Sequence, residues 1–301
     1  MTAQIATPLA ETSSTRNGLI VMFFGILMFS LNDVMGKWLV TTYPVAQVVL
    51  IRSAAAILIL LPFLMRGGIR QIFSVEQPFV QALRVVFSTA ELFCFYLAVA
   101  HLSLADVMTY WLAAPIYVAA LSPLLLGERV GWRRWSAIAV GFLGVVVALE
   151  PTSKALTWPA LIAVLGSLAF GLMMVTGRML RATPDATLAF WQLAGAGLVA
   201  AVFAPSTWLP VGGADLGMLC LLGVVAMSAH MLVNRALKLA DAATVAPLNY
   251  MLLVWAVFFG WLIFGETPRP AVVAGAALIV GSGLFIFFRE QQLKRQGRLP
   301  S

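Results

Sequence analysis

Residues 18–40 read GLIVMFFGILMFSLNDVMGKWLV, an apolar run that polar side chains interrupt mainly near its end. A helix needs about twenty apolar residues to cross the hydrocarbon core of a bilayer, which is about 30 Å thick. The run meets that length, and it is too long for the apolar core of a cleaved signal peptide. We therefore interpret it as the first membrane-spanning helix, preceded by a polar segment that ends at Arg16.

The composition of the whole chain agrees with a lipid environment. Of the 301 residues, 61% are hydrophobic and 10% are charged, and the mean hydropathy is +0.96. A soluble domain carries about 25% charged residues, because its surface must face water. This composition therefore excludes an ordinary soluble protein and predicts a membrane protein.

Turn signals and charge clusters divide the chain into ten candidate spans. They are 17–40, 44–65, 79–101, 104–126 and 133–149 in the first half, and 156–180, 186–204, 215–237, 242–264 and 270–288 in the second. Most of the 19 Lys and Arg then lie on the side of the membrane that holds both termini. Because positive residues stay on the cytoplasmic side, we expect a multi-pass protein of the bacterial inner (plasma) membrane with both termini cytoplasmic.

The two halves of the chain resemble each other. The pattern G-x-L-x-F-x-L occurs at 25–31 and again at 166–172, and a Gly-Glu pair closes each half, at 127–128 and 265–266. Five helices per half would place the second copy in the opposite orientation. The sequence thus predicts an all-α membrane protein of ten transmembrane helices in two inverted five-helix repeats. The repeats cover 17–149 and 156–288, with a tail over 1–16 and a basic tail over 289–301.

Two stretches carry a resemblance to a known family. They are residues 114–128, APIYVAALSPLLLGE, and residues 246–268, APLNYMLLVWAVFFGWLIFGETP. With them, the chain resembles the drug/metabolite transporter superfamily, EamA type, over about residues 17–288. Within that superfamily it is similar to the YddG-type exporters of aromatic and other amino acids.

The resemblance implies a central cavity between helices 1–4 and 6–9, with helices 5 and 10 at the periphery. It also implies export of amino acids, chiefly aromatic and apolar ones, by alternating access. A multidrug or other-metabolite exporter of the same fold is the alternative. The sequence does not distinguish a proton-driven exporter from a facilitator.

Three ionisable residues lie inside predicted spans: Asp33, Arg52 and Glu91. A charge at the bilayer centre costs about 3 kcal/mol or more, so it normally faces a cavity or a partner. We predict that Asp33 and Glu91 line the cavity, and that Glu91 binds substrate or couples transport to protons. The alternative is a purely structural ion pair, of Asp33 with Lys37 or of Arg52 with either acid.

Polar and aromatic side chains of the fourth, eighth and ninth spans complete the candidate cavity. They are Tyr110, Trp111, His230, Asn249 and Tyr250. Pro115 and Pro247 lie in the fourth and ninth spans, and each removes a backbone donor and so frees a carbonyl one turn earlier. We predict that these two prolines are hinges of a gate, although prolines are common in membrane helices.

Motifs for other kinds of chemistry are absent. The sequence has no G-x-x-x-x-G-K-[ST] loop, no H-E-x-x-H and no G-x-S-x-G, and Cys94 and Cys220 stand singly in apolar runs. An intramembrane enzyme and a structural subunit are therefore the weaker alternatives. We expect no catalytic residue, cofactor, metal or nucleic-acid partner, and the sequence leaves the oligomeric state open.

Overall fold

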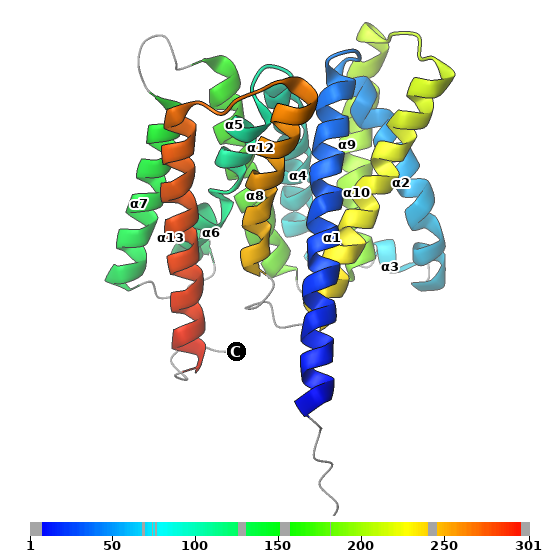
Figure 1. The fold of residues 1–301 in the computed structure, drawn as a ribbon. Coiled ribbons are helices and arrows are strands. Elements are labelled where there is room, and N and C mark those ends of the chain that lie inside the picture. The colour runs from blue at the N-terminus through cyan, green and yellow to red at the C-terminus, as the bar shows by residue number, and fades with distance from the viewer. Residues whose placement is uncertain are drawn as a thin grey trace, which may run out of the picture.

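The computed structural model describes residues 8–67, 70–73, 75, 77–125, 131–150, 157–180, 182–239 and 246–295. Every regular element within these ranges is a helix (Figure 1). The helices are α1 (Pro8–Val40), α2 (Val45–Gly67), α3 (Arg70–Phe73), α4 (Pro78–Val99), α5 (Leu104–Trp111), α6 (Ala114–Leu125), α7 (Trp132–Leu149), α8 (Trp158–Met179), α9 (Asp185–Thr207), α10 (Gly213–Leu239), η1 (Ala246–Tyr250), α12 (Met251–Phe264) and α13 (Pro270–Arg295).

The predicted fold class is confirmed. Nine segments of the described chain are long and apolar enough to cross a membrane, and a shorter apolar helix over Trp135–Leu149 supplies the tenth. Helices α1 and α13 reach beyond the predicted spans, to Pro8 and Arg295, because a helix can continue into water once it leaves the bilayer. The start of α1 and the end of α13 lie at the same end of the bundle (Figure 1). We call this the terminal end and the opposite one the distal end.

The fourth and ninth spans are not the single helices that the sequence predicts. The fourth is broken between α5 and α6, and the ninth begins with the short 3-10 helix η1 before α12. Pro115 follows the first break and Pro247 lies within η1. The ring nitrogen of proline has no hydrogen to donate, so the helical ladder cannot continue through it unchanged. Gating at these two breaks stays a prediction.

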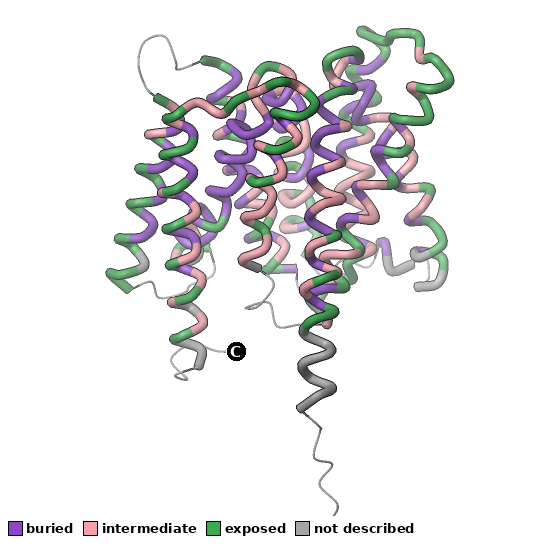
Figure 2. Tube along the Cα trace, in the orientation of Figure 1, coloured by how far each residue is buried: buried purple, intermediate pink, exposed green. Residues whose placement is uncertain are grey.

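Helices of one half pack against helices of the other. The closest pairings are α1 with α10, α4 with α8, α2 with α9 and α7 with α13. Helices α1 and α8 are the first spans of the two halves, and α4 and α10 are the third spans. The pairing of α1 with α10 therefore corresponds to the pairing of α8 with α4. The other two pairings, α2 with α9 and α7 with α13, each join two corresponding spans. This is the packing pattern of two inverted repeats related by a twofold axis in the membrane plane. Helices α7 and α13 form one edge of the bundle (Figure 1), whereas α5 is buried along its whole length (Figure 2).

The repeated glycines lie where helices of opposite halves touch. A Cβ added to Gly25 in α1 would come within 2.9 Å of Val233 in α10, and one added to Gly166 in α8 would come within 2.7 Å of Cys94 in α4. Without a side chain at these points the backbones can approach closely, which is how membrane helices gain packing contacts.

The edge pair α7 and α13 provides a test of this packing. A Cβ at Gly275 would lie 2.6 Å from the Gly144 carbonyl oxygen, whereas a Cβ at Gly281 on the same helix meets nothing within 4 Å. We expect Gly275→Leu to destabilise the protein by about 1–3 kcal/mol, as overpacking does. Thermal unfolding in detergent should show a lower Tm for Gly275→Leu and a nearly unchanged Tm for Gly281→Leu. Equal shifts for the two variants would contradict this packing.

Candidate functional site

Three ionisable side chains from three helices interact electrostatically inside the bundle. Asp33 comes from α1, Arg52 from α2 and Glu91 from α4, and each lies within a membrane-spanning segment. Arg52 interacts electrostatically with both acids, and the two acids interact with each other. Asp33 and Arg52 are buried, 9% and 8% exposed. The three residues form what we call the central cluster.

Each member of the central cluster has a neutral hydrogen-bond partner. Asn32 Nδ2 donates to Asp33 Oδ1 at 3.1 Å, and Trp111 Nε1 donates to Glu91 Oε1 at 3.0 Å. Arg52 Nη1 donates to Tyr96 Oη at 2.8 Å. The guanidinium also lies over the Tyr96 ring, 5.5 Å from its centroid.

The structural ion pairs considered from the sequence are not formed. Lys37 binds Glu266 and the Leu102 carbonyl oxygen, at 2.7 Å for the latter, rather than Asp33 one turn away. Within the described part of the chain, no ion pair joins Arg52 to Asp33 or Glu91. The three intramembrane charges therefore lie near one another without forming direct ion pairs.

Aromatic rings surround the central cluster. The ring of Phe95 packs edge-on against Trp111, with centroids 5.4 Å apart, and against Tyr96, with centroids 5.5 Å apart. On the side of α1 and α10, Phe29 packs edge-on against His230 at 4.8 Å. Edge-to-face pairs of this kind hold their rings in fixed orientations. The region thus combines few, well-placed charges with aromatic walls, as small-molecule sites often do.

The structure directs Tyr110 and Tyr250 away from this region. The Tyr110 ring is fully buried and its hydroxyl donates to the Ala148 carbonyl oxygen in α7 at 3.3 Å. Tyr250 points toward α13, where a Cβ on Gly283 would lie 2.1 Å from its hydroxyl. Tyr110 points away from the central cluster because neighbouring residues project about 100° apart on a helix and Trp111 takes the inward direction. A cavity role for Tyr110 stays a prediction. The Tyr110 hydrogen bond thus joins α5 to α7, and Tyr250 lies against α13.

The remaining predicted residues are spread around the centre. The His230 side chain is exposed, and it interacts electrostatically with Arg52 and packs edge-on against Phe29. Asn249 is exposed in η1, and Pro115 is exposed at the start of α6. The Gly-Glu motif at 127–128 lies outside the described residues. Substrate binding by any of these side chains stays a prediction.

Sequence reasoning missed Tyr96, which is fully buried and is the hydrogen-bond acceptor for Arg52. An arginine inside a span signals that a partner exists, but the partner lies on another helix, at a distance of 44 positions along the chain. Two other polar residues of α4, Arg84 and Ser88, make contacts outside the central cluster. Ser88 donates to the Val85 carbonyl oxygen of its own helix, and Arg84 Nη1 reaches Gln192 Oε1 at 3.5 Å.

A second group of charges lies at the distal end, and we call it the distal cluster. Lys37 at the end of α1 binds Glu266, whose other carboxylate oxygen accepts the Leu104 backbone N–H at 3.0 Å. Arg269 lies 3.7 Å from Asp106 and 2.9 Å from Glu150. Glu266 therefore lies at the start of α5. The distal cluster thereby joins the first half to the segment between α12 and α13.

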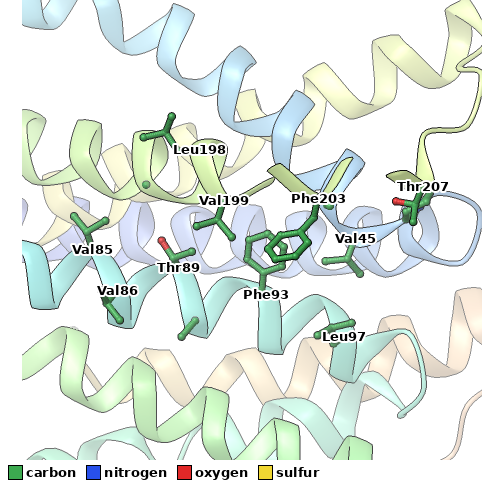
Figure 3. A pocket seen from close by; sticks show the side chains of 14 residues that line it. Val45, Val85, Val86, Thr89, Phe93, Leu97, Leu198, Val199, Phe203 and Thr207 are labelled. Atoms are coloured by element: carbon green, nitrogen blue, oxygen red, sulfur yellow. The ribbon is translucent and has the colours of Figure 1, made fainter. Parts of the chain in front are cut away.

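An apolar groove of about 750 Å³ lies between α4, α9 and the start of α2 (Figure 3). The polar side chains in its wall are Thr89 and Thr207, and no residue of the central cluster lines it. A groove of this composition between membrane helices suits lipid chains rather than a polar solute. Among the described residues, no group of His, Cys, Asp or Glu side chains could hold a metal ion.

Comparison with known proteins identifies the fold. The model of the EamA-like transporter family matches the chain twice, over residues 16–149 and 157–288. The chain belongs to the EamA-like transporter family. One solved chain, described as "Crystal structure of protein", has a TM-score of 0.63 at 19% identity and covers 91% of this chain and 98% of its own length, which shows the shared fold.

Relatives of this EamA-like protein are named for different solutes. A riboflavin transporter of Rhizobium johnstonii is 31% identical over 95% of this chain and 96% of its own length. An S-adenosylmethionine uptake transporter of Rickettsia prowazekii is 27% identical over 92% and 94%. The pseudopaline exporter CntI of Pseudomonas aeruginosa is 28% identical over 88% and 94%. The protein is therefore a multi-pass membrane transporter and not an enzyme, and aromatic amino acids are not the solutes that these names indicate.

Proposed function

We propose that this EamA-like protein carries small organic metabolites out of a bacterial cell, across the inner membrane, by alternating access. The observation that carries the proposal is the central cluster, where Asp33, Arg52 and Glu91 lie inside the membrane without pairing directly. Charges placed there at a cost of several kcal/mol are typical of a substrate or ion pathway. The solute that suits this site has an aromatic or apolar part and at least one charged or polar group.

The arrangement of the two halves supports the alternating-access part of the proposal. We place repeat boundaries at 17–149 and 156–288, and both tails, 1–16 and 289–301, in the cytoplasm. The distal end would then face the outside, and the distal cluster would close it in this conformation. Two inverted repeats provide two similar gates on opposite faces of one central site, which is what alternating access needs.

Transport of unmodified solute into liposomes tests the proposal. Liposomes holding the purified protein and loaded with one unlabelled solute would receive the same solute in labelled form, with riboflavin, S-adenosylmethionine and tryptophan as the panel. We expect at least one of them to accumulate by counterflow, faster than in protein-free liposomes. Accumulation of tryptophan would favour the amino-acid substrates that the sequence predicts, and accumulation of either other solute would favour a metabolite transporter. Absence of counterflow for the whole panel, with folded protein in the liposomes, would contradict the proposal.

A further inference from the structure

Arg52 is a buried cation with an incomplete set of partners. A guanidinium group carries five N–H donors. In the described structure Arg52 makes one hydrogen bond, to Tyr96 Oη, and its Nε is enclosed without an acceptor. An enclosed donor that lacks an acceptor costs about 1–3 kcal/mol, and more for a charged group. Such a position calls for a ligand that supplies the missing acceptor.

The two neighbouring acids do not supply it. Asp33 is engaged by the Asn32 amide and Glu91 by the Trp111 indole, and neither forms an ion pair with Arg52. Lys37 is a second buried cation, and its partners can be compared with those of Arg52. Lys37 is 5% exposed and is bound by both the Glu266 carboxylate and the Leu102 carbonyl oxygen. Arg52 is 8% exposed, and in the described structure it forms no direct ion pair.

We propose that Arg52 is the receptor for a carboxylate on the transported molecule, so that the site takes a zwitterion. This inference rests on the proposed function and names the chemical class of its substrate. The forked guanidinium matches the two oxygens of a carboxylate, and the Tyr96 ring under it fixes the plane of the fork. Asp33 and Glu91 oppose a doubly charged anion such as a phosphate. The same two acids would hold a cationic group of the substrate, and the net charge inside the membrane would then stay unchanged on binding.

A matched set of four probes tests the carboxylate. They are 3-phenylpropionate, L-phenylalanine, phenethylamine and phenethyl alcohol, which share a ring and differ in charge. Equilibrium binding to the full chain in detergent would be followed by tryptophan fluorescence, since Trp111 contacts Glu91. We expect the two carboxylates to bind at least about tenfold more tightly than the alcohol. Arg52→Gln should abolish this preference, whereas Arg133→Gln, at an exposed arginine near the start of α7, should keep it.

Arg52→Lys keeps the charge but removes the fork, so it should weaken carboxylate binding without abolishing it. If Arg52→Gln does not fold, Arg52→Lys is the variant that tests whether the Arg52 guanidinium binds the carboxylate. The proposal is wrong if wild type binds the carboxylates no better than the alcohol, or if either variant binds them as tightly as wild type. Binding is read here without transport. A carboxylate preference that persists where liposomes show no counterflow would overturn the proposed function and leave the role of Arg52 standing.

Discussion

Replacing Glu91 with glutamine is expected to reduce the transport rate by about tenfold or more and to flatten its dependence on pH. Glutamine has the shape of glutamate, and its amide oxygen can still accept the hydrogen bond from Trp111 Nε1. The change therefore removes the charge and little else. An interaction with a charged group is worth about 1.5–3 kcal/mol, and about 1.4 kcal/mol is a factor of ten in rate or affinity. Initial rates of counterflow at acidic, neutral and alkaline pH measure the effect.

Asp185→Asn is the matched control for this prediction. Asp185 is an exposed carboxylate at the start of α9, outside the central cluster, and its replacement should leave both the rate and the pH profile nearly unchanged. If Glu91→Gln behaved like this control, Glu91 would be neither a substrate ligand nor a proton carrier. The central cluster would then be a structural feature.

Glu266→Gln should open the distal end of the bundle. The change leaves Lys37 buried without its anion, and removing one partner of a buried ion pair costs about 3–5 kcal/mol. We expect the lower part of this range, because Lys37 keeps the Leu102 carbonyl oxygen. Hydrogen exchange should rise by about a hundredfold for the backbone amides at the start of α5, where the Leu104 N–H is bonded to Glu266.

Two further variants make this prediction specific. Glu150→Gln weakens an ion pair to Arg269 whose side chains are 44% and 40% exposed, so it should cost about 1 kcal/mol or less. The double variant Lys37→Met with Glu266→Gln leaves no unpaired charge and should recover most of the lost stability. Equal exchange rates in Glu266→Gln and Glu150→Gln would show that the Lys37–Glu266 pair does not hold the distal end closed.

The membrane class and the number of spans follow from the sequence for a simple reason. In lipid, every backbone group must be bonded inside the segment itself, so an apolar run of sufficient length becomes a helix whatever lies beside it. The run at 18–40 accordingly forms most of α1, and the repeat seen in the glycines at 25 and 166 reappears as matching helix contacts. The fourth and ninth spans were predicted as single helices, and Pro115 and Pro247 lie beside or within the irregular parts that the structure shows there.

The contacts between residues of different helices could not be predicted from the sequence in the same way. The pitch of a helix tells which residues share a face, but it does not tell which helix that face meets. Lys37 therefore seemed free to pair with Asp33 four residues earlier, yet it binds Glu266 at a separation of 229 positions. Arg52 meets Tyr96, and Tyr110 and Tyr250 turn toward the edge helices.

Local hydrogen bonding and solvation fix each span within its own stretch of sequence. The site depends on how the spans pack, because close contacts between membrane helices come from side chains that fit across an interface. The sequence alone thus established ten helices in two inverted halves and the charges that they carry. Only the folded bundle shows which groups these charges meet: Asp33, Arg52 and Glu91 interact with one another, and Lys37 pairs with Glu266 at the distal end.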